Sequence, residues 1–337
     1  MPSGDGRRQS RRTWGYWTEH KLSMLSDYLP AFTKASQRSP KTLYLDLFAG
    51  QDRNLSRTTG SPISGSPRVA LDTTPTFSKV VLFELPAQAA RLEAQLRADY
   101  SGRDFQVVPG DCNVTLAPVL RELSQASWDW APTFALVDQY AAEVHWSTLE
   151  RLSRFKRPER SKAELWLLFA PSMLPRGLAS EDAGAIDRFA DRITAMYGSN
   201  EWRKPYAARR MNLLTGSGLR DELLNLMRWR LEHDLGYRVT HSFGMKNTRG
   251  HEIYNMVFAT DHPAGEKIMN HIYGKAAEAQ PFMQAEAAAK VQAEKEEKSG
   301  TPGLFPPLPK PVEYVKLYQH RPPWPPYQLP DDLPDDE

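Results

Sequence analysis

Cysteine is almost missing from this chain, which has only Cys112 among its 337 residues. A single cysteine excludes an intramolecular disulfide and any zinc site built from several thiolates. The chain also lacks an apolar run of about 18 residues, the length that crosses a membrane, and its first residues lack the apolar core of a signal peptide. We therefore expect a cytoplasmic protein without membrane contact, and we assign no metal-binding residues.

An excess of one charge is lacking as well, because 43 Lys and Arg stand against 41 Asp and Glu, a formal net charge of +2. This balance gives no electrostatic case for a polyanionic partner. The charges are nevertheless clustered, with basic segments at 7–12, 154–162 and 203–210 and an acidic end, PDDLPDDE. Two alternatives stay open for the basic segments: solvated surface charge, or a local basic face that contacts a nucleic acid.

Glycine is scarce where a dinucleotide would need it. The stretch LYLDLFAGQDRN at 43–54 is typical of a buried strand followed by a turn at Gly50. The phosphate-binding fingerprint requires further glycines soon after the first, and the four residues after Gly50 are QDRN instead. The loop therefore does not predict a pyrophosphate site.

Hydrophobic residues, by contrast, make up 40% of the chain, so a substantial core can be buried. Several β-branched and aromatic runs lack polar alternation, which is typical of strands buried on both faces. Helix-like segments with apolar residues three and four apart lie between them, and this alternation predicts a doubly wound α/β domain with a parallel sheet. The expected strands are LYLDLF (43–48), KVVLFE (79–84), QVVPGD (106–111), FALVDQ (134–139) and ELWLLFA (164–170).

Helices and an antiparallel strand pair are expected around these strands. A helix with Thr18 as its N-cap precedes the first strand, and residues 181–234 form a helical insertion. Two β-rich runs at 237–245 and 253–260 predict a hairpin, and the following helix carries Pro263 in its first turn. The predicted organisation is a flexible arm (1–12), an α/β domain (13–280), and a helical extension with a Pro-rich tail (281–337).

Four acidic residues stand at the predicted carboxyl ends of successive strands: Asp46, Glu84, Asp111 and Asp138. A single such residue is unremarkable, since Asp often forms caps and turns. Ligands of doubly wound sheets bind at the carboxyl ends of the strands, so four acids at one edge predict a functional cleft.

Five parallel strands, an antiparallel pair and these acids together resemble the class I S-adenosylmethionine (SAM) methyltransferases. More specifically, the chain resembles the three-Cys-motif partner (TcmP) family from about Trp14 to the helix near 275. That family takes its name from a neighbouring cysteine-motif protein, which the resemblance implies as a partner. The resemblance is carried, in order, by DLFAG, GSPRVAL, FEL, GDCN, FALVDQYAAEVHW, LWLLFAPSMLPR and FATDHPAGEKIM.

The resemblance implies SAM as cofactor and assigns its contacts. The loop from Asp46 to Gly50 would wrap the methionine moiety, Glu84 would accept hydrogen bonds from the ribose hydroxyls, and Asp111 would lie beside the adenine. These roles agree with the chemistry, because a carboxylate offers two acceptor oxygens to a vicinal diol. The cofactor-binding set is Asp46, Phe48, Ala49, Gly50, Glu84, Asp111, Cys112 and Asn113.

The fourth strand leads into the predicted acceptor site, where amino-methylating enzymes commonly place Asp or Asn, two prolines and an aromatic residue. Here Asp138, Gln139 and Tyr140 occupy those positions and are the catalytic candidates. Stacking of a base on Tyr140 would be the physical basis of methyl transfer to a nucleobase. Substrate contacts are assigned to His145, Trp146 and Arg176, although Trp146 also suits packing at a helix start and Arg176 a structural salt bridge.

Charged residues depart from the usual SAM loop directly after Gly50. Asp52 holds the place of a second glycine, and Arg53 and Arg57 bring positive charge close to the expected sulfonium. The two arginines suit that cofactor only where they point away from it or pair with Asp52.

Proline dominates the end of the chain, where LFPPLP and WPPY suit docking into an aromatic groove of a protein partner, or a terminus that packs on its own chain. The leading functional hypothesis is a SAM-binding protein or SAM-dependent methyltransferase acting on a nucleic acid or modified nucleoside. An inactive methyltransferase-like partner subunit is the alternative. A metal-dependent nuclease using the four strand-end acids is a further alternative.

Overall fold

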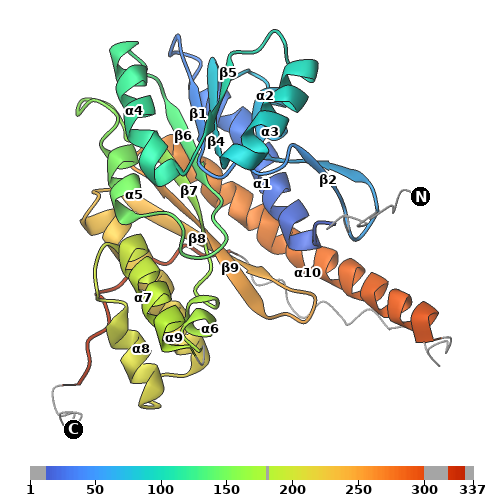
Figure 1. The fold of residues 1–337 in the computed structure, drawn as a ribbon, viewed down its shortest axis with the longest axis vertical. Helices are drawn as coiled ribbons and strands as arrows, with labels where there is room; N and C mark the ends of the chain where they lie inside the picture. The colour runs from blue at the N-terminus through green and yellow to red at the C-terminus, as the bar shows by residue number, and fades with distance from the viewer. Residues whose placement is uncertain (1–12, 180–181, 300–317, 331–337) are drawn as a thin grey trace, which may run out of the picture.

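Seven strands form one sheet in the order β5-β4-β1-β6-β7-β9-β8 (Figure 1). The computed structural model describes residues 13–179, 182–299 and 318–330. The strand order confirms the predicted fold class, a doubly wound, mostly parallel, methyltransferase-like sheet with an antiparallel pair at its end. The parallel strands are β1 (Leu43–Asp46), β4 (Lys79–Glu84), β5 (Phe105–Pro109), β6 (Thr133–Val137) and β7 (Glu164–Phe169), and the antiparallel ones are β8 (Val239–Lys246) and β9 (Glu252–Thr260).

Two hydrophobic cores cover the two faces of this sheet. Along β7, Leu165 and Leu167 belong to one core and Trp166 and Leu168 to the other, because successive strand residues point to opposite faces. Fully burying each such side chain stabilises the fold by roughly 1.5 to 3 kcal/mol. One face is covered by α4 (Cys112–Gln125), α5 (Trp146–Ser153), α7 (Ala183–Tyr197) and α9 (Gly216–His233), and the other by α1 (Tyr16–Ala35), α2 (Ser66–Asp72), α3 (Pro86–Asp99) and α10 (Pro263–Ser299).

The first helix begins earlier than the sequence indicated. Gly15 is the N-cap of α1 and accepts a hydrogen bond from the Thr18 backbone N–H at 2.9 Å, so the prediction of Thr18 as N-cap was wrong. The reason is tertiary, because Trp14 pairs with the chain at 55–57 and thereby fixes where the helix starts. The Pro263 prediction is confirmed, since Pro263 opens α10.

Short elements in the connections were not predicted. β2 (Arg53–Leu55) and β3 (Pro62–Ser64) pair in a small separate hairpin, which is too short and polar to give an alternating signal. The expected helical insertion consists of α7, α8 (Arg203–Arg210) and α9, preceded by the single turn α6 (Leu174–Gly177). None of the helices in the described ranges is both long and apolar enough to cross a membrane.

The described part of the Pro-rich tail, 318–330, packs against its own chain. The Asn225 side chain on α9, only 1% exposed, donates to the Trp324 carbonyl at 2.8 Å and accepts from the Trp324 N–H at 2.9 Å. Arg228 donates to the Arg321 carbonyl at 2.6 Å, and His241 hydrogen-bonds the Tyr318 hydroxyl at 3.0 Å. WPPY therefore belongs to a docked segment, whereas LFPPLP lies outside the described residues.

Candidate functional site

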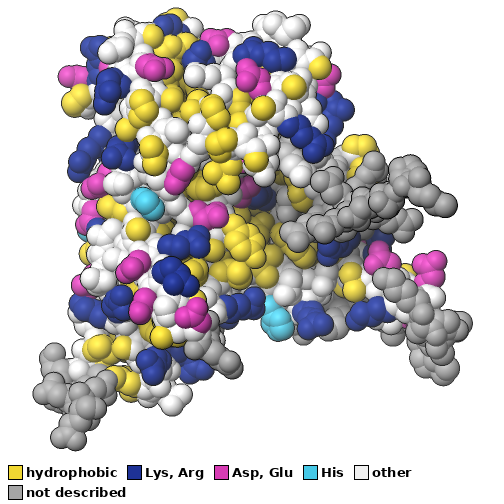
Figure 2. All heavy atoms as spheres, viewed as in Figure 1, with side chains coloured by type: hydrophobic (Ala, Val, Ile, Leu, Met, Phe, Trp, Pro, Cys, Tyr) yellow, Lys and Arg dark blue, Asp and Glu magenta, His cyan; other side chains and the backbone are white. Residues whose placement is uncertain are grey.

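Four acidic residues lie along the carboxyl edge of the sheet. Asp46 ends β1 and Glu84 ends the adjacent β4, while Asp138 directly follows β6 and Asp111 comes two residues after β5. Because these four strands are neighbours and parallel, their carboxyl ends meet at the same edge. In the view of Figure 2, hydrophobic side chains gather in a hollow near the middle of the molecule, between the part that carries α4 and the block of α7 and α8.

Glu84 is a half-buried carboxylate held by the backbone of its own edge. It accepts a hydrogen bond from the Gly50 N–H at 2.6 Å through Oε2 and one from the Leu85 N–H at 2.8 Å through Oε1. Each carboxylate oxygen can accept more than one hydrogen bond, so both retain capacity for a further donor. The arrangement fixes the carboxylate in place and leaves it able to accept from a pair of hydroxyls.

Gly50 forms the open surface of the first loop. Its φ of +64° is a left-handed conformation that favours glycine. Gly50 is exposed, and a Cβ added there would meet only the Phe48 carbonyl oxygen, at 3.8 Å. Ala49 is buried and donates its N–H to the Phe83 carbonyl at 3.0 Å, while Phe48 is half-buried against the core. A ligand can therefore approach the loop most closely at Gly50.

Asp46 supports this loop from below. It is fully buried, and its carboxylate accepts from the Phe48 N–H at 3.3 Å and from the Tyr44 hydroxyl at 3.2 Å. Burial raises the pKa of Asp46 to about 7, although hydrogen bonds from Ser66, Phe48 and Tyr44 oppose the shift. In this structure its side chain positions the loop and does not reach the surface.

Asp111 and the two residues after it have three different environments. Asp111 is exposed and caps α4, accepting at Oδ1 from the Asn113 N–H at 2.8 Å. Cys112 is buried in the core, and burial raises the pKa of its thiol to about 12, which leaves it unreactive. Asn113 accepts from the His145 N–H at 2.8 Å and donates to the Glu143 carbonyl at 2.9 Å. Asn113 thus ties α4 to the loop before α5.

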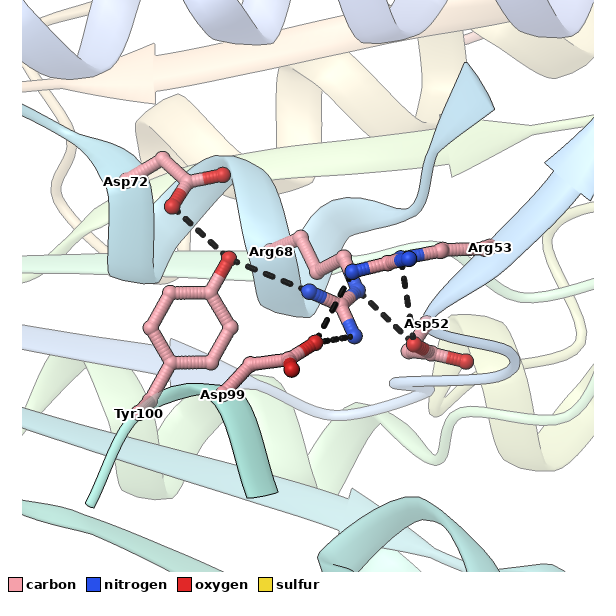
Figure 3. Close-up of polar contacts among 6 residues, drawn as sticks. All are labelled: Asp52, Arg53, Arg68, Asp72, Asp99 and Tyr100. Carbon is pink, nitrogen blue, oxygen red and sulfur yellow. Dashed lines mark hydrogen bonds and ion pairs between the residues drawn. The ribbon is translucent and has the colours of Figure 1, made fainter. Parts of the chain in front are cut away.

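Asp52 is buried and pairs with a buried arginine (Figure 3). The Arg68 guanidinium donates to Asp52 at 2.7 Å and to Asp99 at 2.6 Å. Arg53 also reaches Asp99, at 2.8 Å. Arg53 is therefore paired, but its nearer partner is Asp99 and not the expected Asp52, which lies 3.8 Å away. Arg57, the other arginine expected near the cofactor, takes no part in these ion pairs.

The GSPRVAL motif at 65–71 holds the first loop in place through contacts with Gln51 and Asp52. This role was not predicted from the sequence. Gly65 lets two backbones meet, since a Cβ there would lie 2.0 Å from the Gln51 carbonyl oxygen. Ser66 hydrogen-bonds Asp46, and Arg68 pairs with Asp52. An arginine beside the apolar residues Val69, Ala70 and Leu71 was the available signal for a buried ion pair.

Asp138 is paired with Lys21 of α1. The Lys21 ammonium donates to Oδ2 of Asp138, while Oδ1 makes no hydrogen bond to any described residue. Lys21 is buried and was also missed in the sequence. It lies on the buried stripe of α1 that includes Leu25, Tyr28 and Phe32, so a charged residue at a core-facing position was the available signal.

Gln139 and Tyr140 point in opposite directions. Gln139 is fully buried, and its side-chain oxygen accepts from the N–H groups of Glu143 and Val144 at 2.8 and 2.9 Å. Its role in this structure is therefore to shape the loop. Tyr140 is 74% exposed, and its N–H donates to the Glu143 carboxylate at 2.8 Å, so its ring is accessible to a ligand.

The predicted substrate residues do not converge. Trp146 is buried beside Gly198 and under the Arg230 guanidinium at 4.3 Å, which bears out its packing role. His145 is the exposed N-cap of α5, and its backbone N–H donates to the Asn113 side chain at 2.8 Å. Arg176 is exposed on α6, and its nearest polar contact is the Met173 sulfur at 3.9 Å.

Two exposed apolar side chains beside the acids were not predicted. Leu85, directly after Glu84, is 55% exposed and Val114, three residues after Asp111, is 71% exposed. Large exposed apolar residues next to polar strand ends are typical of ligand sites with a flat apolar component. With Tyr140 they place three apolar surfaces along the same edge.

The strand-end acids do not form a metal cluster. In the part of the chain that the structure describes, no group of three or more His, Cys, Asp or Glu side chains is arranged to hold a metal ion. Asp46 is enclosed by its own hydrogen bonds, and one oxygen of Asp138, Oδ2, is paired with Lys21. The nuclease alternative therefore gains no support from these residues.

The residues of this edge fit SAM. Glu84 and Asp111 present carboxylate oxygens at the ends of adjacent strands, and the hydrogen bond from the Gly110 N–H to the Glu84 carbonyl at 2.9 Å links these ends. Gly50 is open to a ligand, and the Arg68 and Arg53 charges are taken up by Asp52 and Asp99. A cation therefore meets carboxylates here and no unpaired arginine of this network.

Comparison with known proteins gives only remote likenesses. No family model and no curated protein sequence matches this chain. M. jannaschii TYW2, solved in complex with AdoMet, has 9% sequence identity and a TM-score of 0.36, covering 73% of this chain and 76% of that one. A dimethyladenosine transferase from Plasmodium falciparum has 10% identity and a TM-score of 0.31, covering 82% of each chain. At these values the fold assignment depends on the strand order and not on the likenesses.

Proposed function

We propose that this protein binds SAM at the carboxyl edge of its sheet and acts as a SAM-dependent methyltransferase. The observation that carries the proposal is the Glu84 carboxylate, which is half-buried, fixed by the Gly50 and Leu85 N–H groups, and adjacent to the exposed Asp111. Glu84 would accept from the ribose hydroxyls and Asp111 from the exocyclic amine of the adenine. Leu85 and Val114 would cover the faces of the ring.

The methyl acceptor is proposed to lie beside Asp138 and Tyr140. When bound, SAM supplies an electrophilic methyl group, and the protein contributes chiefly by holding the acceptor in line for attack. Oδ1 of Asp138 retains acceptor capacity for an amine, while Lys21 holds Oδ2 and so fixes the carboxylate's orientation. The exposed ring of Tyr140 offers a stacking surface for a base. A nucleic acid or modified nucleoside is therefore the acceptor class to examine first.

Isothermal titration calorimetry with SAM and S-adenosylhomocysteine tests the cofactor assignment. We expect both to bind, with Glu84→Gln weakening the affinity by at least about tenfold through loss of a charged acceptor. Arg91→Gln, an exposed substitution on α3 that makes no contact with Glu84, serves as the matched control. The absence of any heat with either compound at about 1 mM would remove the proposal.

Methyl transfer is tested with radiolabelled SAM and either total RNA or genomic DNA. We expect Asp138→Asn to abolish incorporation while leaving SAM affinity within about twofold, because Asp138 is assigned to the acceptor and not to the cofactor. Tyr140→Ala, an exposed position where folding is not at risk, should reduce incorporation as well. Full incorporation by both variants would contradict the acceptor assignment.

An inactive partner subunit is the second candidate, and the Lys21–Asp138 pair favours it. An ammonium group from the chain itself already lies where an acceptor amine would bind. The finer proposal, that the protein is a three-Cys-motif partner, is supported by the ordered motifs from DLFAG to FATDHPAGEKIM. Co-expression with a three-Cys-motif protein, followed by size-exclusion chromatography, tests this partnership. Separate elution of the two proteins would refute a stable complex.

A further inference from the structure

A sizeable cavity lies at the opposite edge of the sheet from Glu84 and Asp138. Its volume is about 720 Å³, which falls in the range of small-molecule sites. It is lined by the segment between α1 and β1, by residues just before β6 and β7, and by the first turns of α10. Thr133 and Glu164, the first residues of β6 and β7, mark it as an amino-terminal edge.

The walls of this cavity carry an excess of positive charge that the net charge of the chain conceals. Three of its five cations belong to the basic segment 154–162, whose role the proposed function leaves unexplained. Among the described residues, none of the five takes part in an ion pair. The cationic lining consists of Arg38, Lys41, Lys156, Arg160 and Lys162.

One carboxylate, Glu164, lines the same cavity, but its capacity is already used within the protein. It accepts from the Tyr28 hydroxyl at 2.5 Å and from the Thr260 hydroxyl at 3.0 Å. Burial raises the pKa of Glu164 to about 7, so near neutral pH it carries only part of a negative charge. Glu164 therefore leaves most of the positive charge of the walls unbalanced.

Lys156 is the most informative of the cations because it is buried. It is 7% exposed, its ammonium donates to the Ala131 carbonyl, and burial lowers the pKa of Lys156 to about 8. The nearby Asp129 carboxylate favours the charged form of Lys156, but Asp129 is ion-paired with Arg157, and Lys156 itself makes no ion pair with a described residue. A buried ammonium that lacks a paired carboxylate is costly, and an anion in the cavity would reduce that cost. The position of Lys156 thus points to a ligand of opposite charge.

Apolar and aromatic surfaces complete the cavity. Phe32 and Ile268 line it, and the partly exposed Trp130 ring has the Arg160 guanidinium 4.4 Å from its centroid. Arginine stacked on an aromatic ring is held ready to form forked hydrogen bonds with a phosphate group. The walls therefore combine phosphate-binding cations with a surface for a flat ring.

We propose that this cavity binds a nucleotide-class ligand, an organic polyphosphate that carries a flat ring. Five cations opposed by one engaged carboxylate suit several negative charges, and a di- or triphosphate provides these within a volume of about 720 Å³. The ring would pack near Trp130 and the phosphates would meet Lys156 and Arg160. This site is separate from the carboxyl edge, so it does not depend on the proposed methyltransferase function.

Calorimetric titration of the full chain with ATP, inorganic tripolyphosphate and adenosine tests the proposal at about 50 mM salt, where screening is weak. We expect ATP to bind most tightly, tripolyphosphate to bind less tightly and adenosine not to bind. Arg160→Gln, at an exposed position, and Lys156→Gln should each weaken ATP binding by at least about tenfold. Lys275→Gln, an exposed change on α10 outside the cavity lining, should leave it unchanged.

Three results would overturn the proposal. One is the absence of ATP and tripolyphosphate binding at about 1 mM. Another is undiminished ATP binding by both Arg160→Gln and Lys156→Gln, which would place the nucleotide elsewhere. The third is adenosine binding as tight as that of ATP, which would show that the cations play no part. Glu84→Gln separates the two sites, because it should weaken SAM binding and leave ATP binding intact.

Discussion

Arg68 is the single side chain on which the shape of the first loop most depends. It is 5% exposed, and its guanidinium joins the buried Asp52 to the partly exposed Asp99. Hydrogen bonding to Arg68 holds the pKa of Asp99 below its usual range. Without Arg68, Asp52 would be a buried and nearly unpaired carboxylate next to Gly50.

Substituting Arg68 by Met should therefore lower the free energy of unfolding by about 3 to 5 kcal/mol, as expected when one partner of a buried ion pair is removed. The control is Arg53→Met, whose side chain is 57% exposed, with an expected loss of about 1 kcal/mol or less. Urea denaturation followed by circular dichroism measures both. Equal losses for the two variants would contradict the assigned role of Arg68.

Glu164 should make stability depend on pH in a definite direction. Burial raises its pKa from 4.5 to about 7, so the folded protein binds this proton more tightly than the unfolded chain does. The contribution of Glu164 to stability is then greatest below about pH 4.5, falls as pH rises, and levels off above about pH 7. Between those two pH values, the contribution of Glu164 to the free energy of unfolding should fall by about 1.4 kcal/mol per pH unit.

The Glu164→Gln variant has no such group, so its unfolding free energy relative to wild type should increase between about pH 4.5 and 7. The hydrogen bonds from Tyr28 and Thr260 can be kept by the amide, which limits other effects. Thermal or urea unfolding at a series of pH values gives this difference. A difference that stays constant across the interval would contradict the raised pKa.

At the scale of single elements, the sequence was informative wherever the hydrophobic pattern within a segment was clear. The strand KVVLFE was predicted with its observed bounds, because a short apolar run bounded by charged residues is typical of a buried strand. The start of α1 was missed because Trp14 is held by the chain at 55–57, a contact between distant segments. The β2–β3 hairpin carries too few residues for any periodic signal.

The docked tail segment, 318–330, depends on Asn225 more than on its prolines. Asn225→Ala removes both hydrogen bonds to the Trp324 backbone, so the Trp324 amide should exchange its hydrogen at least about tenfold faster. Gln328→Ala, which removes one exposed contact with Lys204, is the matched control and should leave that exchange unchanged. Hydrogen exchange followed by mass spectrometry measures it, and unchanged exchange in Asn225→Ala would show that other contacts hold the segment.

At the scale of the whole molecule, strand order could be predicted and the finer site could not. Alternating strands and helices place Asp46, Glu84, Asp111 and Asp138 at one edge by topology alone. Which of them reach the surface depends on side-chain partners such as Ser66 and Lys21, and these come from segments distant in sequence. A net charge of +2 similarly concealed the cationic cavity, because a sum over the chain says nothing about where charges gather.

A crystal structure of the protein with S-adenosylhomocysteine would show whether the carboxyl edge of the sheet binds the cofactor. We expect the ribose hydroxyls within hydrogen-bonding distance of the Glu84 carboxylate, the adenine between Leu85 and Val114, and the sulfur facing Asp138. Density for the compound in the cavity lined by Lys156 and Arg160, or no density at about 1 mM compound, would contradict this expectation.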